Sequence, residues 1–173
     1  MSGSLVLRGI GELVTNASDR PGDLGIVEDA AVAVVDGRVA YAGPDAELPA
    51  EYADLPGIDV DGRAVIPGFV DAHTHAVFAG DRADEFARRL RGDTYEEILA
   101  AGGGILSTVT ATREAGFEGL WEVAEPRLGR MAWSGSTTIE VKSGYGLDPE
   151  SERTLLEVAA VLDRAQPYTV VTT

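Results

Sequence analysis

The chain contains only two histidines, His73 and His75, and a single residue separates them. They follow an apolar run, residues 65–72, that has the composition of a buried strand. Because alternate side chains of a strand share one face, Asp71, His73 and His75 should project together from its carboxyl end. Two imidazoles on one side can bind zinc or ferrous iron, and a nearby carboxylate can orient them. The spacing therefore indicates a metal site, with a pair of structural histidines as the alternative.

The strand before these histidines is the first of three that alternate with helical patterns. Strands are expected over residues 65–72, 137–141 and 168–172. Three helix signals stand between them: a capping box at Thr94 and Glu97, an apolar helical period over 120–131, and the pair Asp148-Pro149. Pro126 is expected to kink the second helix or to end its first half. Strands separated by helices imply parallel β/α units, arranged as an open sheet or as a barrel.

The length of this region decides how much of a barrel it can form. A complete barrel takes about 250 residues, so the roughly 108 residues after residue 65 supply only about three and a half units. The sequence also stops within a strand-like run, residues 169–173. We therefore expect residues 66–173 to form the first units of an incomplete TIM-like (β/α) barrel, as the amino-terminal part of a longer protein. Barrel enzymes carry their reacting groups at the carboxyl ends of strands, where His73 and His75 stand.

The first 65 residues have a different pattern, typical of β structure. Apolar runs at 30–35 and 39–42 flank Asp36-Gly37, a strong hairpin signal because both central residues of the tight turn need positive φ. The same pattern recurs at Asp61-Gly62. We expect a small antiparallel β-sandwich domain over residues 1–65, so that the fold class is mixed β plus α/β.

The composition of the chain limits the classes of partner it can bind and the cellular compartment that suits it. Fourteen basic and 29 acidic residues give a net charge of −15, which disfavours binding to nucleic acid or to anionic membrane surfaces. Without cysteine, any metal must be held by histidine and carboxylate, and a reducing cytoplasm fits best. The amino terminus lacks a basic run followed by a long apolar stretch, so we expect neither an export signal nor a membrane anchor.

Four stretches together carry a family resemblance. The run VIPGFVDAHTH (65–75) resembles the first barrel strand of the amidohydrolase superfamily. Three more stretches are similar to the imidazolonepropionase family within it: HAVFAGDRADEF (75–86), GGGILSTVTATREA (102–115) and TTIEVKSGYGLD (137–148). The likeness extends from the β domain to the last residue, and the Ser-Gly-Tyr-Gly stretch is far more specific than His-x-His alone.

The resemblance implies a reaction and a metal centre. It implies one zinc or iron ion, with His73 and His75 as two ligands and a histidine and an aspartate from later strands as the others. A metal-activated water would then open the ring of 4-imidazolone-5-propanoate to give N-formimidoyl-L-glutamate, a step of histidine degradation. The remaining ligands and the acid/base group are expected beyond Thr173.

The resemblance also assigns two substrate-binding residues, Arg82 and Tyr145. A guanidinium can bind the substrate's propionate through two parallel hydrogen bonds. The alternative for Arg82 is a surface ion pair with Asp81, Asp84 or Glu85. Tyr145 lies between two glycines in a loop after the second strand, and its alternative is simple packing over that loop.

Two rival functions stay open at this level. The first is another amidohydrolase activity, that of a cyclic amidase or a deaminase. The second is a catalytically inactive piece, since two histidines are fewer than the three protein ligands usual for catalytic zinc.

An incomplete barrel would leave an edge strand without a partner, so we expect the chain to self-associate, and a homodimer is one form that this association could take.

Glu140 and Lys142 lie on one face of the second strand and are expected to form an ion pair.

Overall fold

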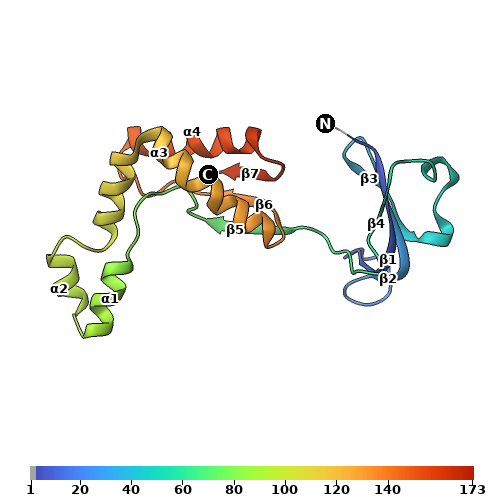
Figure 1. Ribbon diagram of the computed structural model, residues 1–173, viewed down its shortest axis with the longest axis horizontal. Helices are drawn as coiled ribbons and strands as arrows, with labels where there is room; N and C mark the ends of the chain where they lie inside the picture. Colours follow the sequence, from blue (N-terminus) through green and yellow to red (C-terminus); the bar gives the residue numbers. More distant parts are fainter. Residues whose placement is uncertain (1–2) are drawn as a thin grey trace. The chain divides into compact units, whose positions relative to one another are not determined.

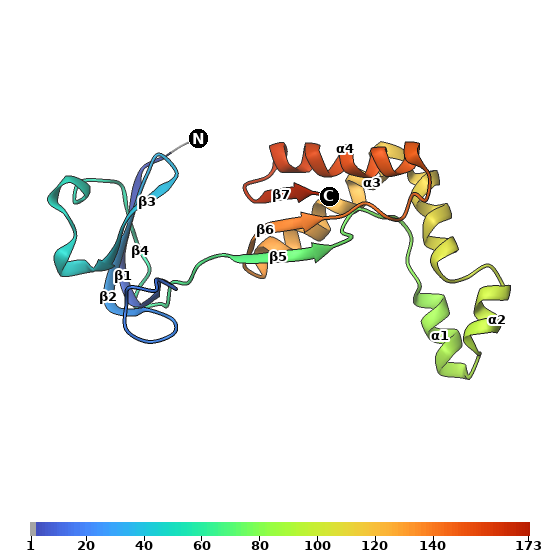
Figure 2. The same cartoon turned by 180° about the vertical axis from the view of Figure 1, so that it is seen from behind.

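The computed structural model describes residues 3–173, which form two compact units. The first unit ends at Pro67 and the second begins at Gly68. Both are drawn in Figure 1 and, from the opposite side, in Figure 2. Within the described residues, no helix combines the length and the apolar character needed to cross a membrane.

The first unit is built on one four-stranded sheet with the order β3-β2-β1-β4. Its strands are β1 (Leu5–Val14), β2 (Ile26–Val35), β3 (Arg38–Pro44) and β4 (Gly57–Asp59), and two 3-10 turns, η1 (Asp45–Glu47) and η2 (Ala50–Tyr52), connect β3 to β4. Strand β2 pairs antiparallel with both β1 and β3, and β4 pairs parallel with β1. One cluster of buried residues in this unit consists of Ile10, Leu13, Val27, Ala30 and Val32.

The Asp36-Gly37 hairpin is confirmed. Strands β2 and β3 pair antiparallel as far as Val35 and Arg38, so these two residues form the whole turn. Their φ angles are 51° and 75°, as a tight hairpin with two left-handed residues requires.

The second hairpin expected at Asp61-Gly62 is wrong. Both residues have positive φ, yet the chain continues beside β1 in the same direction. The N–H of Val60 donates to Arg8 O at 3.0 Å, and the N–H of Val65 donates to Glu12 O at 2.9 Å. The N–H of Gly62 donates to Gly9 O at 2.7 Å, which places the turn beside the irregularity in the pairing of β1 with β2 between Leu7 and Ile10. The sheet is therefore mixed rather than antiparallel, and residues 3–67 contain no second sheet of a sandwich.

The second unit contains a three-stranded parallel sheet with the order β5-β6-β7. The strands are β5 (Phe69–Thr74), β6 (Ser136–Val141) and β7 (Thr169–Thr172); the helices are α1 (Ala83–Arg91), α2 (Tyr95–Ala100), α3 (Ile105–Trp133) and α4 (Pro149–Ala165). The prediction of parallel strands separated by helices is confirmed. Helices α3 and α4 pack against the sheet, whereas α1 and α2 lie away from it (Figure 2).

Local signals set the ends of two helices as predicted. Thr94 and Glu97 form a complete capping box before α2: the Thr94 side chain accepts from the Glu97 N–H, and the Glu97 carboxylate accepts from the Thr94 N–H. Asp148 caps α4 by accepting from the N–H groups of Glu150 and Ser151, and Pro149 occupies the first turn. These interactions join residues no more than three positions apart, so the sequence reveals them directly.

The break in α3 lies at Gly116 instead of Pro126. Gly116 has φ 59° and ψ −169°, a conformation that glycine adopts without steric cost. Pro126 is exposed inside the continuous second half of the helix. A proline on an outer face leaves the unpaired carbonyl of the preceding turn open to water, which reduces the cost of the lost hydrogen bond.

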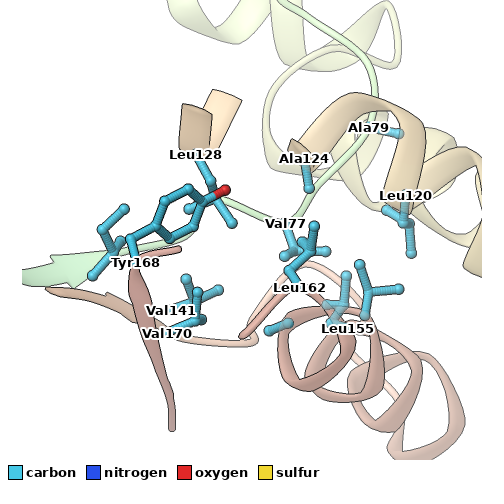
Figure 3. Close-up of a cluster of buried hydrophobic side chains, with 14 residues drawn as sticks. Val77, Ala79, Leu120, Ala124, Leu128, Val141, Leu155, Leu162, Tyr168 and Val170 are labelled. Carbon is cyan, nitrogen blue, oxygen red and sulfur yellow. The ribbon is translucent and has the colours of Figure 1, made fainter. Parts of the chain in front are cut away.

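The core of the second unit lies between its sheet and helices α3 and α4. Figure 3 shows Leu120, Ala124 and Leu128 of α3 and Leu155 and Leu162 of α4 near Val141 and Val170 of the strands. The face of α4 predicted from its apolar period, Leu155, Ala159 and Leu162, is buried. This packing fixes the strands whose carboxyl ends carry the candidate site.

We expect Leu128→Ala to destabilise this unit by about 2–5 kcal/mol, because Leu128 is 0% exposed and its loss leaves a cavity. Both tryptophans of the chain, Trp121 and Trp133, lie in α3, so urea unfolding followed by tryptophan fluorescence reports on this unit. Leu106→Ala in the same helix is the control, since Leu106 is 57% exposed. Equal midpoints for the two variants would contradict the assignment of the core.

Candidate functional site

The carboxyl ends of β5, β6 and β7 meet at one edge of the parallel sheet. The N–H of Lys142, just after β6, donates to Thr74 O at 2.8 Å. The N–H of Ser143 donates to Thr173 O at 3.1 Å. His73 and His75 stand at the end of β5, on the same edge. The residues that follow the three strands are therefore neighbours, although up to 100 residues separate them in the chain.

The two imidazoles lie close enough to serve one ion. Their ring centroids are 5.8 Å apart, with the ring planes at 75°. Two imidazoles that share a zinc ion at Zn–N distances of about 2.0–2.1 Å have centroids about 5 Å apart. The Nδ1 atom of His75 is buried and has no hydrogen-bond partner within residues 3–173. Both observations fit a pair of metal ligands better than a pair of histidines with satisfied hydrogen bonds.

The described residues supply no complete metal site. Among residues 3–173 there is no group of three or more His, Cys, Asp or Glu side chains placed to hold an ion. Asp71 approaches the backbone N–H of His73 at 3.5 Å, a long contact that does not reach an imidazole. His73 and His75 can thus provide two ligands, one fewer than the three protein ligands usual for catalytic zinc.

Tyr145 packs directly against His75. Their ring centroids are 5.5 Å apart and their ring planes make an angle of 64°, an edge-on arrangement. The ring centroid of Tyr145 also lies 5.4 Å from that of Phe78. The loop after β6, residues 143–147, therefore lies beside the loop after β5. The structure brings together three of the four residues that the sequence singled out: His73, His75 and Tyr145.

Gly144 makes this packing sterically feasible. A Cβ atom at this position would lie 2.8 Å from His75 Cε1, and the φ of 145° disfavours any side chain. We expect Gly144→Ala to displace the imidazole and to weaken zinc affinity about tenfold or more, as measured by competition with a chelator. Gly129→Ala in α3 is the control, because a Cβ atom added there would have no neighbouring atom within 4 Å. Unchanged zinc affinity in Gly144→Ala would contradict this account of the loop.

Arg82 is anchored on α3 and has no contact with the two histidines or Tyr145. Its Nε donates to Thr108 Oγ1 at 3.3 Å. No carboxylate of residues 3–173 lies within ion-pair distance of its guanidinium, so the expected alternative, pairing with Asp81, Asp84 or Glu85, is not formed. The cation is thus left available for an external carboxylate.

A row of polar contacts from α3 holds the segment between His75 and Arg82. Thr112 Oγ1 accepts from the N–H of Ala79 at 3.1 Å. The guanidinium of Arg127 donates to the carbonyls of Ala76 and Phe78 and lies 3.9 Å from the Phe78 ring centroid. Burial lowers the pKa of Arg127. Sequence reasoning missed these residues, although Thr108 and Thr112 share a helical face, which is the one signal that could have indicated them.

The ion pair expected between Glu140 and Lys142 is confirmed, with Lys142 Nζ 2.6 Å from Glu140 Oε1. Thr173 Oγ1 donates to the same carboxylate oxygen at 2.7 Å. The hydrogen bond from Lys142, followed by that from Thr173, holds the pKa of Glu140 below its ordinary value, and the nearby His73 acts in the same direction. Glu140 and Lys142 therefore form an ionised pair with no net charge at the edge where the histidines lie.

Among curated proteins, the chain is similar to imidazolonepropionases along nearly its whole length. The chain is 52% identical over 171 residues to imidazolonepropionase of Haloarcula marismortui, covering 97% of this chain and 41% of the relative. It is 49% identical over 162 residues to imidazolonepropionase of Paracoccus denitrificans, covering 94% of this chain and 40% of the relative. A scan against models of protein families finds no match.

Solved structures support the fold. A triazine hydrolase described as coming from Arthobacter aurescens is similar with a TM-score of 0.67 at 17% identity, covering 99% of this chain and 35% of that chain. This likeness supports the mixed α/β architecture of the chain. The chain spans about 40% of the length of the curated relatives it matches. At about 50% identity over nearly all of its length, it belongs to the imidazolonepropionase family, of which it represents the amino-terminal part.

Proposed function

We propose that the full-length protein containing this chain hydrolyses 4-imidazolone-5-propanoate to N-formimidoyl-L-glutamate in histidine degradation. The reaction adds water across a carbon–nitrogen bond of the cyclic amide. The observation that carries the proposal is identity of about 50% to imidazolonepropionases over nearly the whole chain. The cluster of His73, His75 and Tyr145 at the carboxyl edge of a parallel sheet supports it.

His73 and His75 are proposed to hold two positions of one divalent zinc or iron ion. The unpartnered Nδ1 of His75, within the described residues, and the 5.8 Å separation of the rings support this role. When bound, such an ion lowers the pKa of its water to about 7 and so supplies hydroxide at neutral pH. The other ligands and the acid/base group belong to parts of the protein outside this chain.

Arg82 and Tyr145 are proposed to bind the substrate. The guanidinium of Arg82 is fixed by Thr108 and lacks an ion-pair partner within the described residues, which suits it to the propionate. Tyr145 would contact the substrate beside the metal, because its ring already packs on His75. Both groups bind and orient; neither moves a proton in this scheme.

We also propose which domain of the full-length protein each unit belongs to. Residues 1–65 would contribute to a β-sandwich domain, and residues 66–173 would form the first units of the metal-dependent barrel. A cytoplasmic location suits a chain without cysteine.

The test is a spectrophotometric assay of the full-length protein with 4-imidazolone-5-propanoate. We expect loss of the imidazolone absorbance at an enzymatic rate, with about one equivalent of zinc or iron bound. A related cyclic amide without the propionate, and an aminated ring as a deaminase substrate, serve as comparisons. Faster turnover of either comparison compound would favour another amidohydrolase.

The isolated 173-residue chain is expected to have negligible turnover, because it offers only two histidine ligands. The same assay, together with metal analysis of the purified chain, checks this. Turnover near that of the full-length protein with stoichiometric metal would overturn it.

A further inference from the structure

The loop that carries Tyr145 is held by a single carboxylate from α4. Glu152 Oε1 accepts from the backbone N–H of Gly146 at 2.8 Å and from that of Leu147 at 2.7 Å. The other oxygen of this carboxylate, Oε2, is buried and has no hydrogen-bond partner within the described residues. Two of the five residues from 143 to 147 thus bind Glu152, and one of them, Gly146, directly follows Tyr145, which the proposed mechanism uses.

The loop has little freedom to move away from Glu152. A Cβ atom on Gly146 would lie 2.7 Å from the backbone nitrogen of Glu152, so the loop packs directly on the first turns of α4. On its other side, Arg113 Nε donates to Gly146 O at 2.6 Å. Tyr145, which directly precedes Gly146, lies with its ring against His75 and Phe78.

Glu152 is not needed to start the helix. Asp148 already caps α4 through the N–H groups of Glu150 and Ser151. Burial alone raises the pKa of Glu152, but the hydrogen bonds that the N–H groups of Leu147 and Gly146 donate to it help to hold the pKa below its ordinary value. The carboxylate therefore stays ionised at neutral pH, when it binds backbone N–H groups most strongly.

We propose that Glu152 is a positioning residue: through the loop of residues 143–147, it holds Tyr145 against His75. The contribution to catalysis rests on the proposed function, in which Tyr145 contacts the substrate. Glu152 itself touches neither the substrate nor the metal ligands and acts only through the loop.

The test compares Glu152→Gln with Glu157→Gln in the full-length protein. Glu157 lies on the same helix and is exposed, and its side chain makes no hydrogen bond within the described residues. Backbone hydrogen exchange, measured by mass spectrometry on peptides covering 143–148, should be about tenfold to hundredfold faster in Glu152→Gln only. Peptides from the buried face of α4 should keep wild-type exchange in both variants, which excludes general unfolding.

A double-mutant cycle tests the route through Tyr145. Glu152→Gln and Tyr145→Phe should each raise KM for 4-imidazolone-5-propanoate several-fold with a smaller change in kcat. Combined, they should raise KM little beyond the larger single effect. Additive effects, or unchanged exchange in Glu152→Gln, would overturn the inference. If the wild-type protein does not hydrolyse this substrate, the proposed function fails, and the exchange measurement still decides whether Glu152 holds the loop.

Discussion

Replacing His75 with alanine is expected to abolish metal retention in the full-length protein and to lower kcat/KM at least about a thousandfold. The side chain is one of only two imidazoles in the chain, and its Nδ1 is buried without a partner among residues 3–173. Its removal takes away a ligand and leaves His73 alone on this side of the ion. Without the metal, the pKa of the attacking water rises from about 7 to its far higher value in bulk water, so hydroxide becomes scarce at neutral pH.

Metal analysis after dialysis measures the first effect, and initial rates over a range of substrate concentrations measure the second. Tyr145→Phe is the matched control, because it alters a side chain that packs on His75 without removing a ligand. We expect this control to retain about one equivalent of metal. Full metal content and near wild-type rates in His75→Ala would refute the assignment of His75 as a ligand.

The features predicted correctly from the sequence are those set by residues close together in the chain. The capping box of Thr94 and Glu97 and the Asp36-Gly37 hairpin involve a few consecutive positions. Asp61-Gly62 has the same residue types and the same positive φ angles, yet it forms no hairpin. The direction of the chain after this turn depends on pairing with β1, about 50 residues earlier in the sequence. No local signal indicates that pairing.

The same distinction applies to the helix break. Proline at 126 is a strong local signal, but its cost depends on whether the carbonyl it leaves unpaired can reach water. Pro126 is exposed, so the helix continues, whereas Gly116 ends the first half because the chain needs a positive φ there. Exposure is a property of the packed unit and cannot be known from the sequence around the residue.

In the candidate site, the sequence names the candidate residues, but it does not identify the residues that hold their loops in place. His73 and His75 are recognisable because they share a strand end, and Tyr145 because of the motif around it. The contacts that position them join distant residues: Arg127 reaches Ala76 across 51 positions, and Arg82 reaches Thr108 across 26. Threonines and arginines are common on helix surfaces, so only the fold identifies those that hold a functional loop.

The second large effect is expected for Arg82→Ala, which should raise KM for 4-imidazolone-5-propanoate at least about a hundredfold with a smaller change in kcat. Two charge-assisted hydrogen bonds to the propionate would be lost, each worth about 1.5–3 kcal/mol. Arg82→Lys should recover only part of the affinity, because an ammonium cannot form the parallel pair. The cation also matters more in a chain of net charge −15, which otherwise repels an anionic substrate.

Arg89→Ala is the matched control, since Arg89 lies in α1, is exposed and forms no ion pair within the described residues. Steady-state kinetics with a substrate analogue that lacks the propionate separates the two roles that Arg82 could have. If Arg82 binds the carboxylate, its removal leaves kcat/KM for the analogue nearly unchanged. An equal loss for both compounds would instead mean that Arg82 acts through Thr108 and the segment that carries the histidines, and that the propionate is bound elsewhere.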